Sequence, residues 1–203
     1  MNTTIMLVAL GIIIIANIVL RIVLNRKRDD VAQKLTQYLV HKEYDKFDEL
    51  VDSKEAKRVI PSYNLTYFKL NKAIQMNKDQ EVDQLMQEIA GVKMSNRQKE
   101  ELYLRVFNYY VFKHRKQKAV YYLTKIKEEI KDEGLILYCT RLYDIEILKK
   151  NDLLEPLLEE LKDLSGQQQV WDLTLVSLIY KNQNNEEKAM EYANKAKRFL
   201  AQG

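Results

Sequence analysis

Apolar and polar residues follow one another along most of this chain with the spacing of an α-helix. From residue 31 onward, apolar side chains recur every three to four positions, in stretches that short polar turns separate. Each turn lies between two such stretches and therefore predicts a helical hairpin. The predicted turns are His41–Glu43, Asn77–Asp79, His114–Lys116, Asn151–Asp152 and Asn182–Asn185. The pattern predicts an all-α domain over residues 31–203.

The N-terminal stretch is almost uniformly apolar. Residues 5–24 form a run of 20 residues, which as a helix extends about 30 Å, the thickness of the hydrocarbon core of a bilayer. This pattern predicts a single transmembrane helix. A cleaved signal peptide is the first alternative, but it would have a basic N-terminus and small residues before the cleavage site. A buried core helix is the second, but it would have a polar face.

Basic residues occur only near the end of the predicted span and after it: Arg21, Arg26, Lys27 and Arg28. Lys and Arg are retained on the cytoplasmic side of a membrane. The pattern therefore predicts a single-pass protein of the cell membrane with its N-terminus outside and its helical domain in the cytoplasm. We expect a short N-terminus at 1–4, the span at 5–24, a basic juxtamembrane linker at 25–30 and the helical domain at 31–203.

The predicted hairpins recur with a nearly constant period. A small or apolar residue comes early in each second helix, at steps of 35, 37, 37 and 33 residues: Phe47, Val82, Ala119, Pro156 and Ala189. A second series precedes the turns in register: Tyr38, Ala73, Tyr110, Ile147 and Tyr180. Such a period, with two helices per step, indicates an α-solenoid of about five stacked hairpins. An irregular helical bundle is the alternative.

The last of these units resembles the tetratricopeptide repeat family. It has Tyr180 at the family's aromatic position, a turn at Asn184-Asn185, and Ala189 and Ala196 where the family uses alanine for close helix packing. The third unit is less similar, and the fourth departs from the pattern because Pro156 stands where a small residue is expected. The resemblance implies a stack of helical hairpins that binds other proteins.

In that family, the first helix of each hairpin lines a concave groove that holds an extended peptide or a partner helix. The resemblance places Asn71 and Asn108 at equivalent positions in the groove, 37 residues apart, where their amides could hold a peptide backbone. Family members that clamp a terminal carboxylate pair such asparagines with lysines, and Tyr67 replaces one of those. The full set of candidate groove residues is Tyr67, Asn71, Asn108, Arg141, Trp171, Lys181 and Asn182.

The chain offers few residues for catalysis or cofactor binding. His41 and His114 are 73 residues apart, and the single Cys139 lies in an apolar stretch. The 5 glycines are scattered and form no phosphate-binding loop. With a net charge of +4 there is no basic stripe typical of nucleic-acid binding. We expect no enzyme activity, no cofactor, no metal site, no nucleic acid and no small-molecule substrate.

These observations together predict a membrane-anchored helical-repeat adaptor or scaffold that binds a protein partner at the cytoplasmic face of the membrane. Besides that unidentified protein, membrane lipid would contact the transmembrane helix. The first alternative is a membrane-tethered chaperone or assembly factor outside the cytoplasm, and the charge asymmetry disfavours it. The second is an enzyme on a helical scaffold, which would require a cluster of titratable residues in a cavity.

Overall fold

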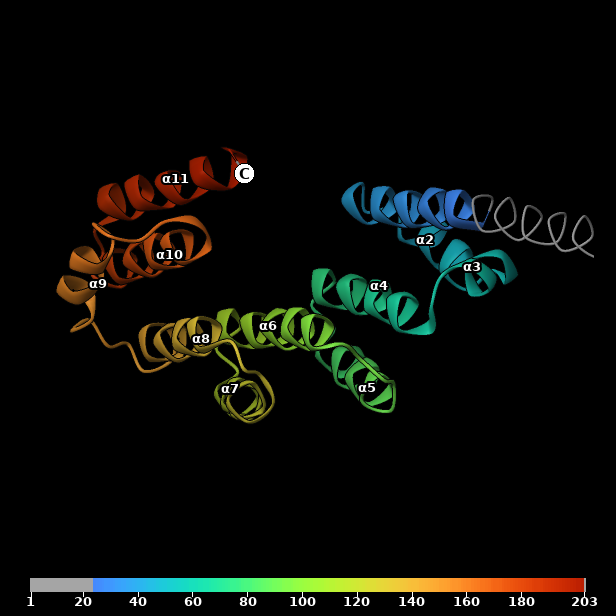
Figure 1. The fold of residues 1–203 in the computed structure, drawn as a ribbon, viewed down its shortest axis with the longest axis horizontal. Helices are drawn as coiled ribbons and strands as arrows, with labels where there is room; N and C mark the ends of the chain where they lie inside the picture. Colours follow the sequence, from blue (N-terminus) through green and yellow to red (C-terminus); the bar gives the residue numbers. More distant parts are fainter. Residues whose placement is uncertain (1–23, 203) are drawn as a thin grey trace, which may run out of the picture. The chain divides into compact units, whose positions relative to one another are not determined.

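The computed structural model describes residues 24–202, and every regular element in them is an α-helix (Figure 1). The prediction of an all-α fold is therefore confirmed. The chain divides into two compact units, Met1–Lys93 and Met94–Gly203. The first unit contains a helix at 24–40 followed by α2 (Tyr44–Val51), α3 (Lys54–Val59), α4 (Ser62–Gln75) and α5 (Asp79–Ala90). The second contains α6 (Asn96–Phe112), α7 (Lys116–Glu129), α8 (Glu133–Glu146), α9 (Leu154–Glu160), α10 (Gly166–Asn182) and α11 (Glu186–Gln202).

Within each unit, successive helices form hairpins that pack on one another. In the first unit α4 contacts α2, α3 and α5, and in the second α8 contacts α6, α7 and α10. A single hairpin cannot bury its apolar face alone, so each needs its neighbour. These contacts are compatible with the predicted helical-repeat fold. α3 is an additional short helix that the sequence pattern did not predict.

A residue in the left-handed conformation ends the first helix of every hairpin. These residues have φ between 52° and 58° and follow one another at intervals of 35, 37, 35 and 35: Lys42, Asn77, His114, Lys149 and Asn184. At Asn77 the chain reverses through two backbone hydrogen bonds, from Asn77 N–H to Ile74 (3.1 Å) and from Lys78 N–H to Ala73 (2.9 Å). This Schellman arrangement satisfies the last carbonyls of the helix.

The same pair of hydrogen bonds recurs at Lys42, His114 and Asn184. In all four of these hairpins the loop between the two helices has three residues. The turn is thus the most regular part of the repeat. Its regularity explains why a nearly constant period could be read from the sequence.

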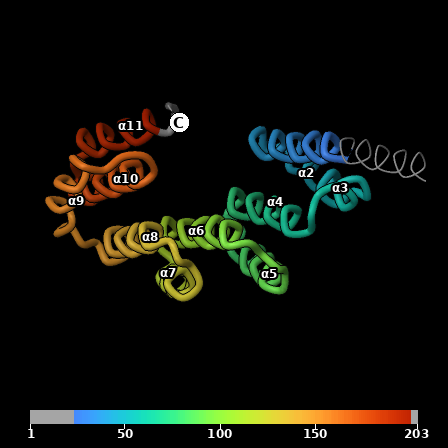
Figure 2. Tube along the Cα trace, in the orientation of Figure 1, coloured from blue at the N-terminus to red at the C-terminus, as the bar shows by residue number. Residues whose placement is uncertain are grey.

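The fourth hairpin differs, and two predicted register positions in it are wrong. Its loop, 147–153, has seven residues, and Figure 2 shows the longer connection between α8 and α9. The residue four positions before the left-handed one is Ile145, which is fully buried, whereas the predicted Ile147 is only partly buried. In the second helix Leu157 is fully buried, and the predicted Pro156 is exposed.

The core of the first unit joins its hairpins. Val31 and Leu35 of the helix 24–40 pack with Phe47, Ala56 and further apolar residues of α2 to α4. Polar side chains reinforce this junction, because the ammonium of Lys72, which is only 8% exposed, donates to both carboxylate oxygens of Asp48 at 2.6 and 2.5 Å.

The last hairpin has closely packed helices. Ala189 and Ala196 of α11 are each 6% exposed. The Ser177 hydroxyl of α10 donates to the carbonyl oxygen of Ala189 at 2.7 Å, so little room is left at this contact. The Tyr180 and Tyr192 rings stack beside it with centroids 5.6 Å apart.

Replacing Ala189 with leucine should therefore overpack the contact between α10 and α11. We expect the free energy of unfolding to fall by about 1–3 kcal/mol, measured by urea denaturation. Met190→Leu changes the neighbouring position, where the side chain is 64% exposed, and should have almost no effect. Equal losses in the two variants would contradict this packing.

The prediction of a membrane-spanning helix requires correction. No helix in the part of the chain that the structure describes is long and apolar enough to cross a membrane. The predicted span, 5–24, lies outside the described residues except for Leu24. The helix that begins there is highly charged in its first turns and includes residues 25–30. The predictions of a transmembrane helix and of a single-pass membrane localisation are therefore not supported.

Candidate functional site

α8 presents two faces to different surroundings. Asp132 caps its N-terminus by accepting a hydrogen bond from the Leu135 N–H at 2.9 Å. Leu135 and Leu142 are buried in the hairpin core. Leu137 and Arg141, four residues apart, share another face of the helix, and the Leu137 side chain is 48% exposed. This second face carries the site.

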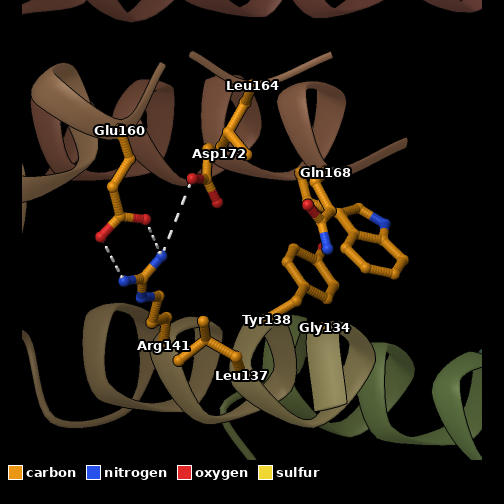
Figure 3. Close-up of a pocket in the computed structure, with 9 residues that line it drawn as sticks. Gly134, Leu137, Tyr138, Arg141, Glu160, Leu164, Gln168 and Asp172 are labelled. Atoms are coloured by element: carbon orange, nitrogen blue, oxygen red, sulfur yellow. Dashed lines mark hydrogen bonds and ion pairs between the residues drawn. The ribbon is translucent and has the colours of Figure 1, made fainter. Parts of the chain in front are cut away.

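A pocket of about 90 Å³ lies between α8, the C-terminal part of the α9 segment and α10 (Figure 3). The residues that line it are Gly134, Leu137, Tyr138, Arg141, Glu160, Leu164, Gln168, Trp171 and Asp172. A Cβ atom on Gly134 would lie 2.9 Å from the Gln168 side-chain nitrogen. The absence of a side chain at this position therefore allows Gln168 to approach α8.

One side of the pocket is aromatic and aliphatic. The Tyr138 and Trp171 rings stack with centroids 5.0 Å apart and planes 19° from parallel. Tyr138 is buried and Trp171 is half-buried. Burial raises the pKa of the Tyr138 phenol, which therefore stays neutral at physiological pH. This wall supplies contact area for an apolar group.

The other side of the pocket is charged. Figure 3 shows Arg141 pointing from α8 toward Glu160 and Asp172. Its Nη1 and Nη2 donate to the two carboxylate oxygens of Glu160, each at 2.7 Å, in a bidentate pair. Nη1 also lies 3.7 Å from the carboxylate of Asp172. One guanidinium thus faces two carboxylates.

The two carboxyl groups have opposite pKa shifts. The hydrogen bonds from Arg141 lower the pKa of Glu160. Burial raises the pKa of Asp172 to about 6, with Arg141 acting to lower it and the neighbouring Glu160 carboxylate adding to the rise. Asp172 is only 6% exposed, whereas the Glu160 side chain is 41% exposed. The difference in burial explains the opposite directions.

Of the predicted groove residues, Arg141 and Trp171 lie together in this pocket. The others lie elsewhere. The Asn182 amide nitrogen donates to the carbonyl of Ile145 at 3.0 Å, and its oxygen accepts from the Lys149 ammonium at 3.0 Å. Asn182 therefore links the end of α10 to the turn after α8. The neighbouring Lys181 is exposed.

The two predicted asparagines occupy equivalent places in their hairpins. Asn71 and Asn108 each lie six residues before the left-handed residue of the turn. The Asn71 amide donates to the backbone oxygen of Tyr67 at 3.0 Å, and Tyr67 stacks on Tyr63. The side-chain oxygen of Asn108 is buried without a hydrogen-bond partner in the described structure. Asn71 belongs to the first unit and Asn108 to the second, and their role in a groove stays a prediction.

The predicted basic cluster lies in part outside the described residues. Arg21 falls among the residues that the structure does not describe. Arg26, Lys27 and Arg28 are exposed in the helix 24–40, and Arg28 forms an ion pair of 3.3 Å with Asp29.

Sequence reasoning missed the acidic residues and Leu137. Asp172 carried a signal, because it is the one charged residue in the mostly apolar stretch from Val170 to Tyr180. A carboxyl group in such a stretch is either exposed or held by a partner from another helix. Glu160 gave no comparable signal, since it is one of several acidic residues in α9 and its flanks.

The described residues contain no group of three or more His, Cys, Asp or Glu that could hold a metal ion. Cys139 is buried, and burial raises the pKa of its thiol to about 12, so it is a poor nucleophile. His41 and His114 are exposed at hairpin turns. The arrangement in the pocket can hold a ligand group by apolar contact and charge.

Comparison with known proteins gives no significant match to a family model, to a curated protein or to a solved structure.

Proposed function

We propose that this chain is a helical-repeat adaptor that binds a segment of another protein. The observation that carries the proposal is the pocket between α8 and α10, where the 48% exposed Leu137 stands next to the Tyr138–Trp171 stack. Single exposed apolar residues are common on protein surfaces. An exposed leucine at the edge of an aromatic-lined pocket is the more specific feature, because such pockets anchor apolar side chains of partners.

The size of the pocket favours a protein segment over a small molecule. Sites for cofactors and drug-sized ligands have volumes of about 300–1,000 Å³, whereas this pocket measures about 90 Å³. It accommodates the end of one side chain. A partner that inserts one side chain here would obtain the rest of its affinity from contacts along the neighbouring helices.

We also propose that the hairpins are tetratricopeptide-like repeats. Three observations support this: the spacing of 35 to 37 residues between left-handed turn residues, the three-residue loops of four hairpins, and the buried Ala189 and Ala196. The seven-residue loop after α8 and the additional helix α3 are departures from that pattern.

The proposal is tested with a displayed library of random peptides selected on the immobilised full-length chain. Leu137→Lys should weaken the binding of selected peptides by about tenfold or more, because a charge replaces an apolar contact at the pocket edge. Val120→Lys is the matched control, since Val120 is 44% exposed on α7, outside the pocket. Affinities are measured by fluorescence anisotropy after circular dichroism has shown unchanged helicity.

If the library yields no binder, or if both variants bind the selected peptides as tightly as the wild type, the pocket is not the binding site. A loss with Val120→Lys alone would place the site on α7.

A further inference from the structure

Asp172 is a buried acidic residue at the wall of the pocket. The residue as a whole is 6% exposed, and its side chain is 9% exposed. Its ion pair with Arg141 measures 3.7 Å, which is longer than a hydrogen bond. A carboxylate can accept about four hydrogen bonds. Asp172 therefore retains capacity to accept donors from a ligand.

Charge in the pocket is not balanced by the protein. Arg141 directs both terminal nitrogens to Glu160, at 2.7 Å each. The three charged side chains that line the pocket come from three segments, Arg141 on α8, Glu160 on α9 and Asp172 on α10. With both carboxylates ionised their sum is one negative charge, so a cation would complete the site.

The remaining walls restrict which cation fits. Leu137, Leu164 and the Tyr138–Trp171 stack line the pocket beside the charged group. A hydrated inorganic ion would gain nothing from these apolar surfaces. A long aliphatic stem with a positive tip would bury its stem against them and place its charge at the carboxylates, as lysine and arginine side chains do.

We propose that the pocket receives a lysine or arginine side chain of the partner segment, with its stem against Leu137 and Trp171 and its charge paired with Asp172. This inference rests on the proposed function, because it names the side chain by which the bound segment is recognised. The Arg141 charge is already used by Glu160.

The single tryptophan of the chain makes the pocket directly observable. Trp171 is the only Trp among the 203 residues, so the indole N–H signal in a ¹H–¹⁵N NMR spectrum of the full-length chain reports this pocket alone. The probe is n-butylammonium, the side-chain analogue of lysine. Matched probes are 1-butanol and butyrate, which keep the alkyl chain and carry no charge or a negative charge.

We expect a saturable shift of the Trp171 signal with n-butylammonium, and affinities at least about tenfold weaker for 1-butanol and butyrate. Asp172→Asn should weaken n-butylammonium binding by about tenfold, whereas Asp163→Asn, at an exposed position outside the pocket, should leave it unchanged. Because the pKa of Asp172 is about 6 in the free chain, the wild type should also bind n-butylammonium more weakly at pH 5 than at pH 7.5.

Equal shifts with all three probes would overturn the inference, and so would unchanged n-butylammonium binding in Asp172→Asn. Absence of a saturable shift with n-butylammonium would do the same. Selected peptides distinguish this failure from failure of the proposed function. Peptides that need Leu137 but contain no Lys or Arg would leave the adaptor proposal in place and contradict only the cation. If no peptide binds, the adaptor proposal fails.

Discussion

Replacing Leu157 with alanine is expected to lower the free energy of unfolding by about 2–5 kcal/mol, one of the largest effects of any single substitution considered for this chain. Leu157 is fully buried in α9, a helix that packs against α10. The substitution removes buried methyl groups and leaves a cavity that a packed helix pair fills only in part. Urea denaturation followed by circular dichroism at 222 nm measures the loss.

The control is Pro156→Ala at the adjacent, exposed position. The proline lies in the first turn of α9, where its missing N–H costs nothing, so its replacement should change stability by less than about 1 kcal/mol. The sequence pattern assigned the packing position to Pro156 instead. A larger loss in Pro156→Ala than in Leu157→Ala would restore that assignment and contradict the structure.

The error in the fourth hairpin has a physical cause. Three of the four hairpins with three-residue loops turn at Asn77, His114 and Asn184, and the other turns at Lys42. Asparagine and histidine tolerate a positive φ more readily than most residues. The fourth turn uses Lys149, which gives no such signal, and the polar Asn151-Asp152 pair two positions later drew the predicted turn to itself. Because the turn was placed two residues too late, the predicted register position in the first helix was Ile147 instead of Ile145.

The helical class and the period were predictable because they depend on local patterns that recur. The pocket was predictable only in part. Arg141 and Trp171 were identified as sharing one surface, but the pairing of Arg141 with Glu160 and Asp172 depends on how α8, α9 and α10 are rotated against one another. A spacing along one helix does not determine that rotation, and the seven-residue loop after α8 removes the regularity that would have helped.

The predicted membrane span shows a different limit. A run of apolar residues long enough to cross a bilayer predicts a span from length and composition alone. The described residues include no helix that meets those requirements, and their first helix packs Val31 and Leu35 against α2 and its neighbours.

Arg141→Met is expected to be the second large perturbation. The substitution keeps an unbranched side chain in the pocket but removes the charge that Glu160 and Asp172 share. Losing one partner of a buried ion pair leaves the other buried without compensation and costs about 3–5 kcal/mol. Because the Glu160 side chain is 41% exposed and water can solvate it, we expect a smaller effect than this, about 2–3 kcal/mol at pH 7.5.

The loss should depend on pH in a defined direction. The pKa of Asp172 is raised to about 6 in the folded chain, above the ordinary value of 3.8, so the folded state binds its proton more tightly than the unfolded state. The stability that this proton contributes is fully present below pH 3.8 and is lost as the pH rises through about 6. Arg141 acts to lower that pKa, so in Arg141→Met it should rise further.

Asp172 is then mostly protonated at pH 5 in the variant, and the uncompensated charge is gone. The lowered pKa of Glu160 makes the stability of the wild type fall as the pH falls, which is the opposite direction. This stability is lost only below the ordinary pKa of 4.5, so it is still present at pH 5. The difference in unfolding free energy between wild type and Arg141→Met should therefore be smaller at pH 5 than at pH 7.5. Urea denaturation at the two pH values measures it.

Two further variants separate charge from packing in this experiment. Arg105→Met removes an exposed arginine of α6 and should cost little at either pH. Adding Asp172→Asn to Arg141→Met removes the buried charge itself and should recover a substantial part of the loss at pH 7.5. If the loss is the same at both pH values and Asp172→Asn recovers none of it, Arg141 stabilises the hairpins by packing. The unfolding free energies would then give no evidence for the excess negative charge on which the proposed cation recognition depends.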